Sequence, residues 1–404
     1  MDIAPILSTL RRHKIAASLI VLEIALTCAI VCNAIFLIGH RLERMGAPTG
    51  MAETELLHLR VFNAQRVENA DALTLQDLAT LRGLPGVKGA TVLNQIPFGN
   101  NSSDIGIRLA PDQPTPTLKA AFYSVGELVV PTLGLRVVDG RDFMPDEFRP
   151  QSAVETDPHL RVPTVMLSRL TAERLFPRVS AVGKSIYIFG STPSLVVGVL
   201  ETLGSTHPGS DETTYAVMMP VRPPYDQGSY MLRVDSAQRS QVLNVAADAL
   251  AALDSRRIIS DKDLFADMRA RYYQQDRWMA VLLAAMCVAL LVVTAFGIVG
   301  LASFWVQQRT RMIGVRRALG ATRGQILHYF QTENLLLTSI GIAIGMAGAY
   351  GINHWLMLHY ALPRLPGFYL PVGALALWLL GQLAVLGPAR RAAALPPVVV
   401  MRLS

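Results

Sequence analysis

The stretch RTRMIGVRRALGAT, residues 309–322, lies between two long apolar runs of the chain. The run before it, residues 279–306, has 28 residues and no charged side chain. In the run after it, residues 335–358, only His354 can become charged near neutral pH. Crossing a bilayer takes about 20 predominantly apolar residues. Both runs are therefore predicted to cross a membrane, and the basic stretch between them is predicted to face the cytoplasm.

The composition indicates a membrane protein with a large water-exposed part. The 404 residues are 51% hydrophobic and 17% charged, and the mean hydropathy is +0.35. Transmembrane helices are predicted at residues 15–38, 278–306, 335–358 and 368–388. The first of them could instead be a cleaved signal peptide. Its 24 residues exceed the usual apolar length of ~7–15 and no small-x-small site follows, so a retained helix is the better interpretation.

The placement of Lys and Arg predicts the topology. Three segments, residues 1–14, 307–334 and 389–404, together hold 11 Lys and Arg and two acids, whereas residues 41–276 hold 24 Lys and Arg and 27 acids. Short basic segments stay in the cytoplasm, so both termini and the 307–334 loop are expected in the cytoplasm and the large domain outside the cell membrane. In a cell with two membranes that membrane is the inner one, and the large domain lies in the periplasm. The net charge of +7 thus belongs to membrane-flanking segments and does not indicate a nucleic-acid surface.

The predicted fold class is a membrane α-helical protein with four transmembrane helices and a mixed α+β domain of two lobes between the first and second spans. This domain is expected at 41–260, with strand-helix-strand arms at about 53–98 and 229–260 and an inserted lobe at about 100–225. Residues 261–277 are predicted to form a stalk helix continuous with the second span. Acidic side chains in its first turns would favour the helix dipole.

The sequence offers no catalytic, cofactor-binding or metal-binding constellation. Its three cysteines, Cys28, Cys32 and Cys287, lie in the first two spans, and its eight histidines form no His-Glu-x-x-His motif. The string VGKS at 182–185 ends like a phosphate-binding loop, but Arg178 stands where the motif needs its first glycine. A turn before a strand is the better interpretation, so the sequence carries no recognisable machinery for nucleotide hydrolysis.

The basic stretch predicts a short amphipathic helix that contacts a partner. Its apolar residues fall on one helical face: Met312, Val315 and Leu319. Gly320 suits the end of this helix, and Thr322 with Gln325 matches a capping box that begins the next one. A loop that only anchors the chain to membrane lipid is the alternative. The ordered apolar face, glycine break and cap favour a docking helix.

Several strings resemble FtsX-like permeases, particularly MacB-type ABC transporters. The loop between the second and third spans of that family is similar to RTRMIGVRRALGATRGQIL (309–327), and its C-terminal end to PARRAAALPPVVVMRLS (388–404). The family's periplasmic core resembles LGLRVVDGRDF (133–143), PTVMLSRLTAERLF (163–176) and GKSIYIFGSTPSLVVGVLE (183–201). The resemblance covers nearly the whole chain, in the order one span, exported domain, three spans, without a fused ATPase.

The resemblance implies the permease subunit of an ABC transporter whose periplasmic domain moves when a separate ATPase subunit works. It also implies a dimer with an identical or homologous permease and, in a two-membrane cell, a periplasmic adaptor and an outer-membrane exit duct. The residues that match the ATPase-coupling motif are Arg309, Arg311, Met312, Gly314, Val315, Arg316, Arg317, Leu319, Gly320 and Thr322.

Export or efflux of a periplasmic substrate by mechanotransmission is the expected function. Regulation of an extracellular cell-wall hydrolase and release of lipoproteins are alternatives within the family. A membrane-bound enzyme is a third class, but no catalytic constellation supports it.

Two features inside the predicted spans have more than one interpretation. Glu23 is the one acid in the first span, where a carboxylate is costly. It could form a hydrogen-bonded latch between spans or protomers, or it could be a neutral carboxyl or one that reaches a polar crevice near the cytoplasmic side. Gly341 and Gly345 permit close helix contact, which we expect within the chain rather than at a dimer seam.

Overall fold

The computed structural model divides into two compact units. The helical unit comprises residues 1–45 and 275–404, and the α/β unit comprises residues 46–274. The structure describes residues 14–63, 69–156, 162–204, 215–226, 228–254, 256–360 and 364–394. Most of the predicted N-terminal segment 1–14 and much of the predicted tail 389–404 lie outside these residues.

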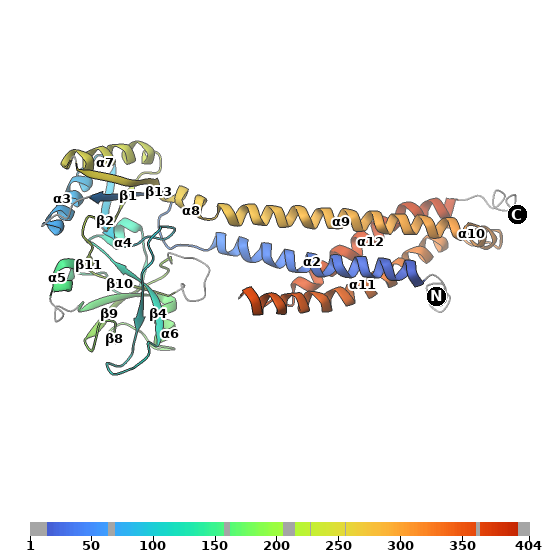
Figure 1. Ribbon diagram of the computed structural model, residues 1–404, viewed down its shortest axis with the longest axis horizontal. Coiled ribbons are helices and arrows are strands. Elements are labelled where there is room, and N and C mark those ends of the chain that lie inside the picture. The colour runs from blue at the N-terminus through green and yellow to red at the C-terminus, as the bar shows by residue number, and fades with distance from the viewer. Residues whose placement is uncertain are drawn as a thin grey trace. The chain divides into compact units, whose positions relative to one another are not determined.

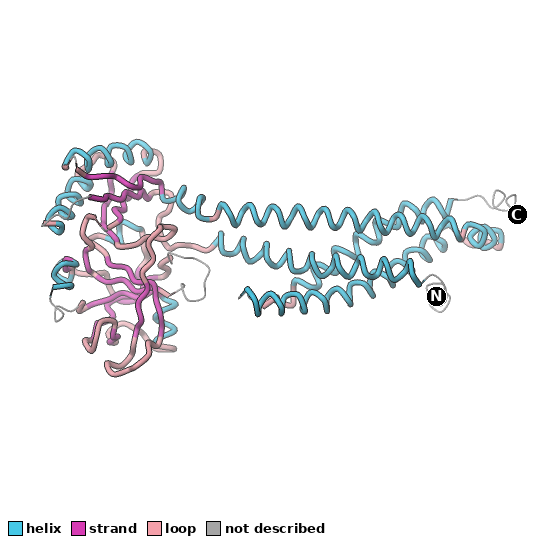
Figure 2. Tube along the Cα trace, in the orientation of Figure 1, coloured by secondary structure: helices cyan, strands magenta, loops and turns pink. Residues whose placement is uncertain are grey.

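Within its described residues, the helical unit has four helices long and apolar enough to cross a membrane: α2 (Lys14–Gly46), α9 (Gln274–Gln308), α11 (Arg323–Tyr360) and α12 (Tyr369–Ala394) (Figure 1). Their most apolar windows have a mean hydropathy of 1.8 to 2.8. Helices α2, α9 and α11 include the first three predicted spans and extend beyond them at both ends, whereas α12 begins one residue after the predicted start at 368 and ends beyond 388. Together with the mixed content of the α/β unit (Figure 2), they confirm the predicted fold class.

Close packing of α11 against α2 explains two of the glycines of α11, Gly341 and Gly345. A Cβ atom on Gly345 would lie 2.5 Å from Cβ of Cys28, and one on Gly341 would lie 2.8 Å from Cβ of Ile24. Any larger residue would therefore force the helices apart. The small-residue motif packs within the chain, as predicted from the sequence.

The first lobe of the α/β unit is a four-stranded sheet in the order β13-β1-β12-β2, in which every neighbouring pair is antiparallel. Helices α3 and α7 cover one face of it. This is the split strand-helix-strand arrangement, in which the two arms of the sequence alternate across one sheet. Its elements are β1 (Leu56–Asn63), α3 (Ala70–Arg82), β2 (Val87–Leu93), β12 (Ser229–Val234), α7 (Arg239–Leu253) and β13 (Arg257–Leu264).

Apolar and polar side chains alternate along β1, so the two faces of the strand differ. Leu57, Leu59 and Val61 are fully buried in the core that includes residues of α3 and α7. Successive strand residues point to opposite faces, so His58 and Arg60 point to the face away from those helices.

The second lobe is inserted between the arms and holds a seven-stranded sheet. Its order is β3-β4-β10-β7-β9-β5, with β8 paired to β9. The strands are β3 (Asp104–Ile107), β4 (Leu118–Ser124), β5 (Val137–Gly140), β7 (Thr164–Ser168), β8 (Ser185–Tyr187), β9 (Pro193–Leu200) and β10 (Ala216–Met219). Short helices and a two-stranded sheet complete it: η1 (Pro145–Glu147), β6 (Arg149–Pro150), α5 (Gln151–Thr156), α6 (Arg169–Leu175) and β11 (Val221–Arg222). Helix α4 (Val129–Leu133) packs instead against β2 and β12 of the first-lobe sheet.

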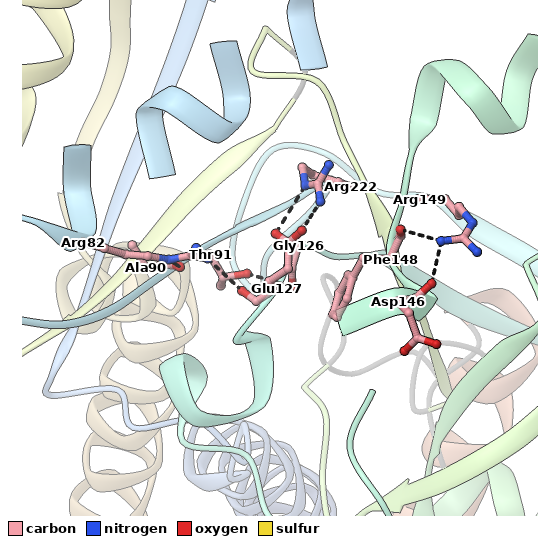
Figure 3. A network of polar contacts seen from close by, with 9 residues as sticks. All are labelled: Arg82, Ala90, Thr91, Gly126, Glu127, Asp146, Phe148, Arg149 and Arg222. Atoms are coloured by element: carbon pink, nitrogen blue, oxygen red, sulfur yellow. Dashed lines mark hydrogen bonds and ion pairs between the residues drawn. The ribbon is translucent and has the colours of Figure 1, made fainter. Parts of the chain in front are cut away.

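Polar contacts tie the first lobe to the second (Figure 3). Arg82, in the last turn of α3, donates from Nε to the carbonyl of Ala90 at 2.9 Å and from Nη2 to the carbonyl of Glu127 at 3.2 Å. The Glu127 carboxylate in turn pairs with Arg222 of β11. Two arginines from different lobes therefore meet on one residue.

The predicted stalk helix at 261–277 is wrong at its start and in its continuity with the second span. Strand β13 continues to Leu264, α8 (Phe265–Tyr272) begins only there, and a break at Tyr273 separates α8 from α9. The cause is pairing with β1, where Asp261 lies opposite Arg60 and Asp263 opposite His58. Acids that looked like the first turn of a helix instead alternate along a strand.

Candidate functional site

The basic stretch forms helix α10 (Thr310–Ala318), and the residue that precedes it is buried. Arg309 is 7% exposed and pairs through Nη1 with Glu333 of α11 at 2.7 Å, while Glu333 is 1% exposed. The guanidinium also lies over the Trp305 ring, 5.4 Å from its centroid. The sequence predicts that Arg309 contacts a partner. In the structure its side chain instead holds the N-terminal end of α10 to α11.

One face of α10 is apolar and exposed. Met312 is 40% exposed, Val315 54% and Leu319, which follows the helix, 83%. Ile313 and Gly314 are buried against the rest of the helical unit. Exposed apolar residues of this size at helical spacing form a surface that a partner could cover.

The arginines of the stretch divide into two groups. Arg311 and Arg316 are exposed, and Arg316 lies 5.3 Å from the centroid of the Tyr329 ring. Arg317 is half-buried and donates to the carbonyl of Ala393 in α12. Arg311 and Arg316 are therefore accessible to a partner, whereas Arg317 links α10 to α12.

The turn after α10 is closed by the residues predicted for it. Gly320 has φ +95°, a left-handed conformation that favours glycine. Its N–H donates to the Arg317 carbonyl at 3.1 Å. Thr322 and Gln325 form the predicted capping box, with N–H to side-chain distances of 2.9 and 3.3 Å.

A groove of about 280 Å³ runs between α10 and the first turns of α11. Met312 and Arg316 line it from α10, and Tyr329 and Phe330 line it from α11. Sequence reasoning did not assign Tyr329 or Glu333 to this site. Glu333 is the one acidic residue in the basic 307–334 loop, and this position could have indicated that it pairs with an arginine of the loop.

Glu23 lies half-buried in α2 and faces α9 of the same chain. A Cβ atom on Gly297 would lie 2.5 Å from Oε2 of Glu23, so the glycine makes room for the carboxylate. One turn along, the hydroxyls of Thr27 and Thr294 are 2.8 Å apart. The polar residues of these two helices therefore face each other.

Among the described residues, no group of three or more His, Cys, Asp or Glu side chains is placed to hold a metal ion.

Two family descriptions match the chain: MacB-like periplasmic core domain over residues 20–255, and FtsX-like permease C-terminal over residues 284–397. The chain is 29% identical to Macrolide export ATP-binding/permease protein MacB of Chromobacterium violaceum, over 70% of this chain and 43% of that protein. It is 30% identical to the MacB protein of Nitrobacter winogradskyi, over 58% of this chain and 38% of that protein. It is 23% identical to Uncharacterized ABC transporter permease YknZ of Bacillus subtilis, over 98% of this chain and 97% of that protein. The matches thus span less than half of the MacB proteins and nearly all of YknZ.

Proposed function

Because the chain belongs to the family of FtsX-like ABC transporter permeases with a MacB-like periplasmic core domain, we propose that it couples a separate ATPase subunit to movement of its periplasmic domain. The movement would drive export or efflux of a substrate from the periplasm. ATP and Mg²⁺ bind on the ATPase subunit. The near full-length match to a protein named as a permease supports this division of labour.

The observation that carries the proposal is the exposed apolar face of α10. Met312, Val315 and Leu319 are exposed at helical spacing, while the buried pair of Arg309 and Glu333 holds the base of the helix. A helix with a held base and an open apolar face can transmit force from a bound partner to α9 and α11. Arg311 and Arg316 flank the open face and would select an acidic rim on the partner.

The assembly we propose is a dimer of permeases in the inner membrane, with both termini and α10 in the cytoplasm. One ATPase docks on each α10. The α/β unit lies in the periplasm, where a periplasmic adaptor and an outer-membrane exit duct complete the path. The excess of Lys and Arg in the segments flanking the spans supports this orientation.

The test is co-purification of the chain with the ABC ATPase expressed beside it. Leu319→Asp and Arg316→Glu are each expected to reduce the bound ATPase about tenfold or more, because loss of a central interface contact costs ~2 kcal/mol. Arg391→Glu, an exposed charge reversal in the last turn of α12, is the matched control. Arg316 is chosen over Arg317 because Arg317 also contacts α12.

The yield of ATPase decides the outcome. Wild-type recovery of the ATPase with both α10 variants, in protein that remains monodisperse, would overturn the docking proposal. An equal loss with Arg391→Glu would also count against it, since charge alone would then explain the effect.

A further inference from the structure

A polar pocket of about 290 Å³ lies on the face of the first-lobe sheet that points away from α3 and α7. Strands β1 and β13 form its floor, and α8 and the residues after β2 form its walls. This volume is close to the lower end of small-molecule sites, which span roughly 300–1,000 Å³. None of the residues that line this pocket belongs to α10.

His58 lies in the floor of this pocket with unmet hydrogen-bonding capacity. The residue is 3% exposed, and neither Nδ1 nor Nε2 has a hydrogen-bond partner among the described residues. Buried polar atoms are nearly always paired, so two ring nitrogens in the floor of a pocket are suited to bind a ligand that enters it. Burial lowers the pKa of His58 to about 4 despite the nearby carboxylates of Asp261 and Asp263, so the neutral ring offers one donor and one acceptor near neutral pH.

The charges around His58 leave one cation and one anion available. Asp263 pairs with Arg271 of α8 at 2.6 Å. Arg60 and Asp261 lie opposite each other on β1 and β13, and neither forms an ion pair with a described residue. A guanidinium and a carboxylate on neighbouring strands can hold the carboxylate and the ammonium of one small zwitterion.

A second cavity of about 1110 Å³ adjoins the pocket and lies within the same unit. Arg60 and Asn101 line both cavities. Phe62, two residues along β1 from Arg60, and Phe122 of β4 line the larger one. A ligand whose charged groups sit at Arg60 and Asp261 could therefore extend an apolar side chain towards aromatic residues.

We propose that this pocket binds an α-amino acid with a bulky apolar side chain. Its carboxylate pairs with Arg60, its ammonium pairs with Asp261, and His58 contributes a further hydrogen bond. A metal ion is not the favoured occupant, because His58, Asp261 and Asp263 are not among any described group placed to hold one. The proposal stands apart from ATPase docking and holds whether or not α10 is the coupling helix.

The test is equilibrium dialysis of the purified full chain in detergent against radiolabelled L-phenylalanine. Saturable binding is expected, with glycine, 3-phenylpropionate and phenethylamine competing at least tenfold more weakly. Each of these lacks the side chain, the ammonium or the carboxylate. Arg60→Gln and Asp261→Asn are each expected to weaken binding about tenfold or more, since each removes a charged hydrogen-bonding partner.

The control is Lys262→Gln. Lys262 lies between Asp261 and Asp263 on β13 and donates to the Asn244 side chain of α7, on the opposite face. The Lys262→Gln variant is expected to bind L-phenylalanine as tightly as the wild type does. The proposal fails if wild-type chain shows no saturable binding, if 3-phenylpropionate binds as tightly as L-phenylalanine, or if Arg60→Gln and Asp261→Asn, both monodisperse, bind like the wild type.

Discussion

His58 illustrates how much the environment of one residue can depend on its strand partners. Its pKa is lowered from 6.5 to about 4, with burial as the largest cause and Arg60 adding to it, while Asp261 and Asp263 oppose it. Between those two pH values the unfolded chain binds a proton that the folded chain does not. The stability of the α/β unit is therefore expected to be unaffected by His58 above pH 6.5 and to fall as the pH decreases towards 4.

The size of this loss follows from 1.36 kcal/mol per pKa unit, which gives ~3 kcal/mol. Hydrogen exchange of the β1 amides in the full chain, corrected for intrinsic exchange rates, measures it as the free energy of opening. His58→Met removes the titrating group and is expected to flatten the decrease between pH 6.5 and 4. Identical pH profiles for His58→Met and wild type would show that His58 does not titrate as described.

The buried pair of Arg309 and Glu333 gives a second prediction at the residue scale. Arg309→Met leaves Glu333 buried without its charge partner, which is expected to cost ~3–5 kcal/mol and to lower the thermal midpoint of the chain in detergent. Arg311→Met, at an exposed position, is the matched control and is expected to leave it unchanged. The double variant Arg309→Met with Glu333→Leu is expected to recover much of the loss. An unchanged midpoint in Arg309→Met would mean that the pair does not hold α10.

At the scale of elements, the turn between α10 and α11 depends on the left-handed conformation of Gly320. Gly320→Ala is expected to destabilise this turn by ~1–2 kcal/mol, seen as faster hydrogen exchange in residues 310–325. Gly324, four residues later, has no positive φ and lies in the first turn of α11. Gly324→Ala is therefore expected to leave exchange unchanged or slow it slightly. Equal effects of the two substitutions would contradict this account of the turn.

Elements determined by local signals were predictable from the sequence, and those determined by pairing were not. Gly320 and the box of Thr322 and Gln325 act within a few residues, so pattern alone located the end of α10 and the start of α11. The end of β13 depends on β1, about 200 residues earlier. Taken alone, Asp261 and Asp263 are equally compatible with the first turn of a helix. Only the pairing of their backbone with Arg60 and His58 of β1 places them in a strand.

The same limit applies to the candidate site. The exposed face of Met312, Val315 and Leu319 followed from helical spacing. The burial of Arg309 did not, because it requires Glu333 from the next helix. The pocket around His58 was also beyond sequence reasoning, since the register of two strands brings its charges together.

At the scale of the whole molecule, topology is the property that charge placement predicts. A cysteine in place of Arg316 is expected to react with a membrane-impermeant maleimide only after the inner membrane is opened. A cysteine in place of Val179, which is 60% exposed in the α/β unit, is expected to react without that step. The three native cysteines are buried and give a low background. Labelling of position 316 from outside would reverse the proposed orientation.

The central claim, that a nucleotide-hydrolysing subunit grips α10, is tested most directly by photocrosslinking in living cells. A benzophenone amino acid in place of Leu319 is expected to form an adduct that mass spectrometry identifies as an ABC ATPase, and one in place of Val179 is expected to form none with that protein. Absence of an ATPase adduct at position 319 in a chain that reaches the membrane, or an adduct there with a periplasmic protein, would contradict the account.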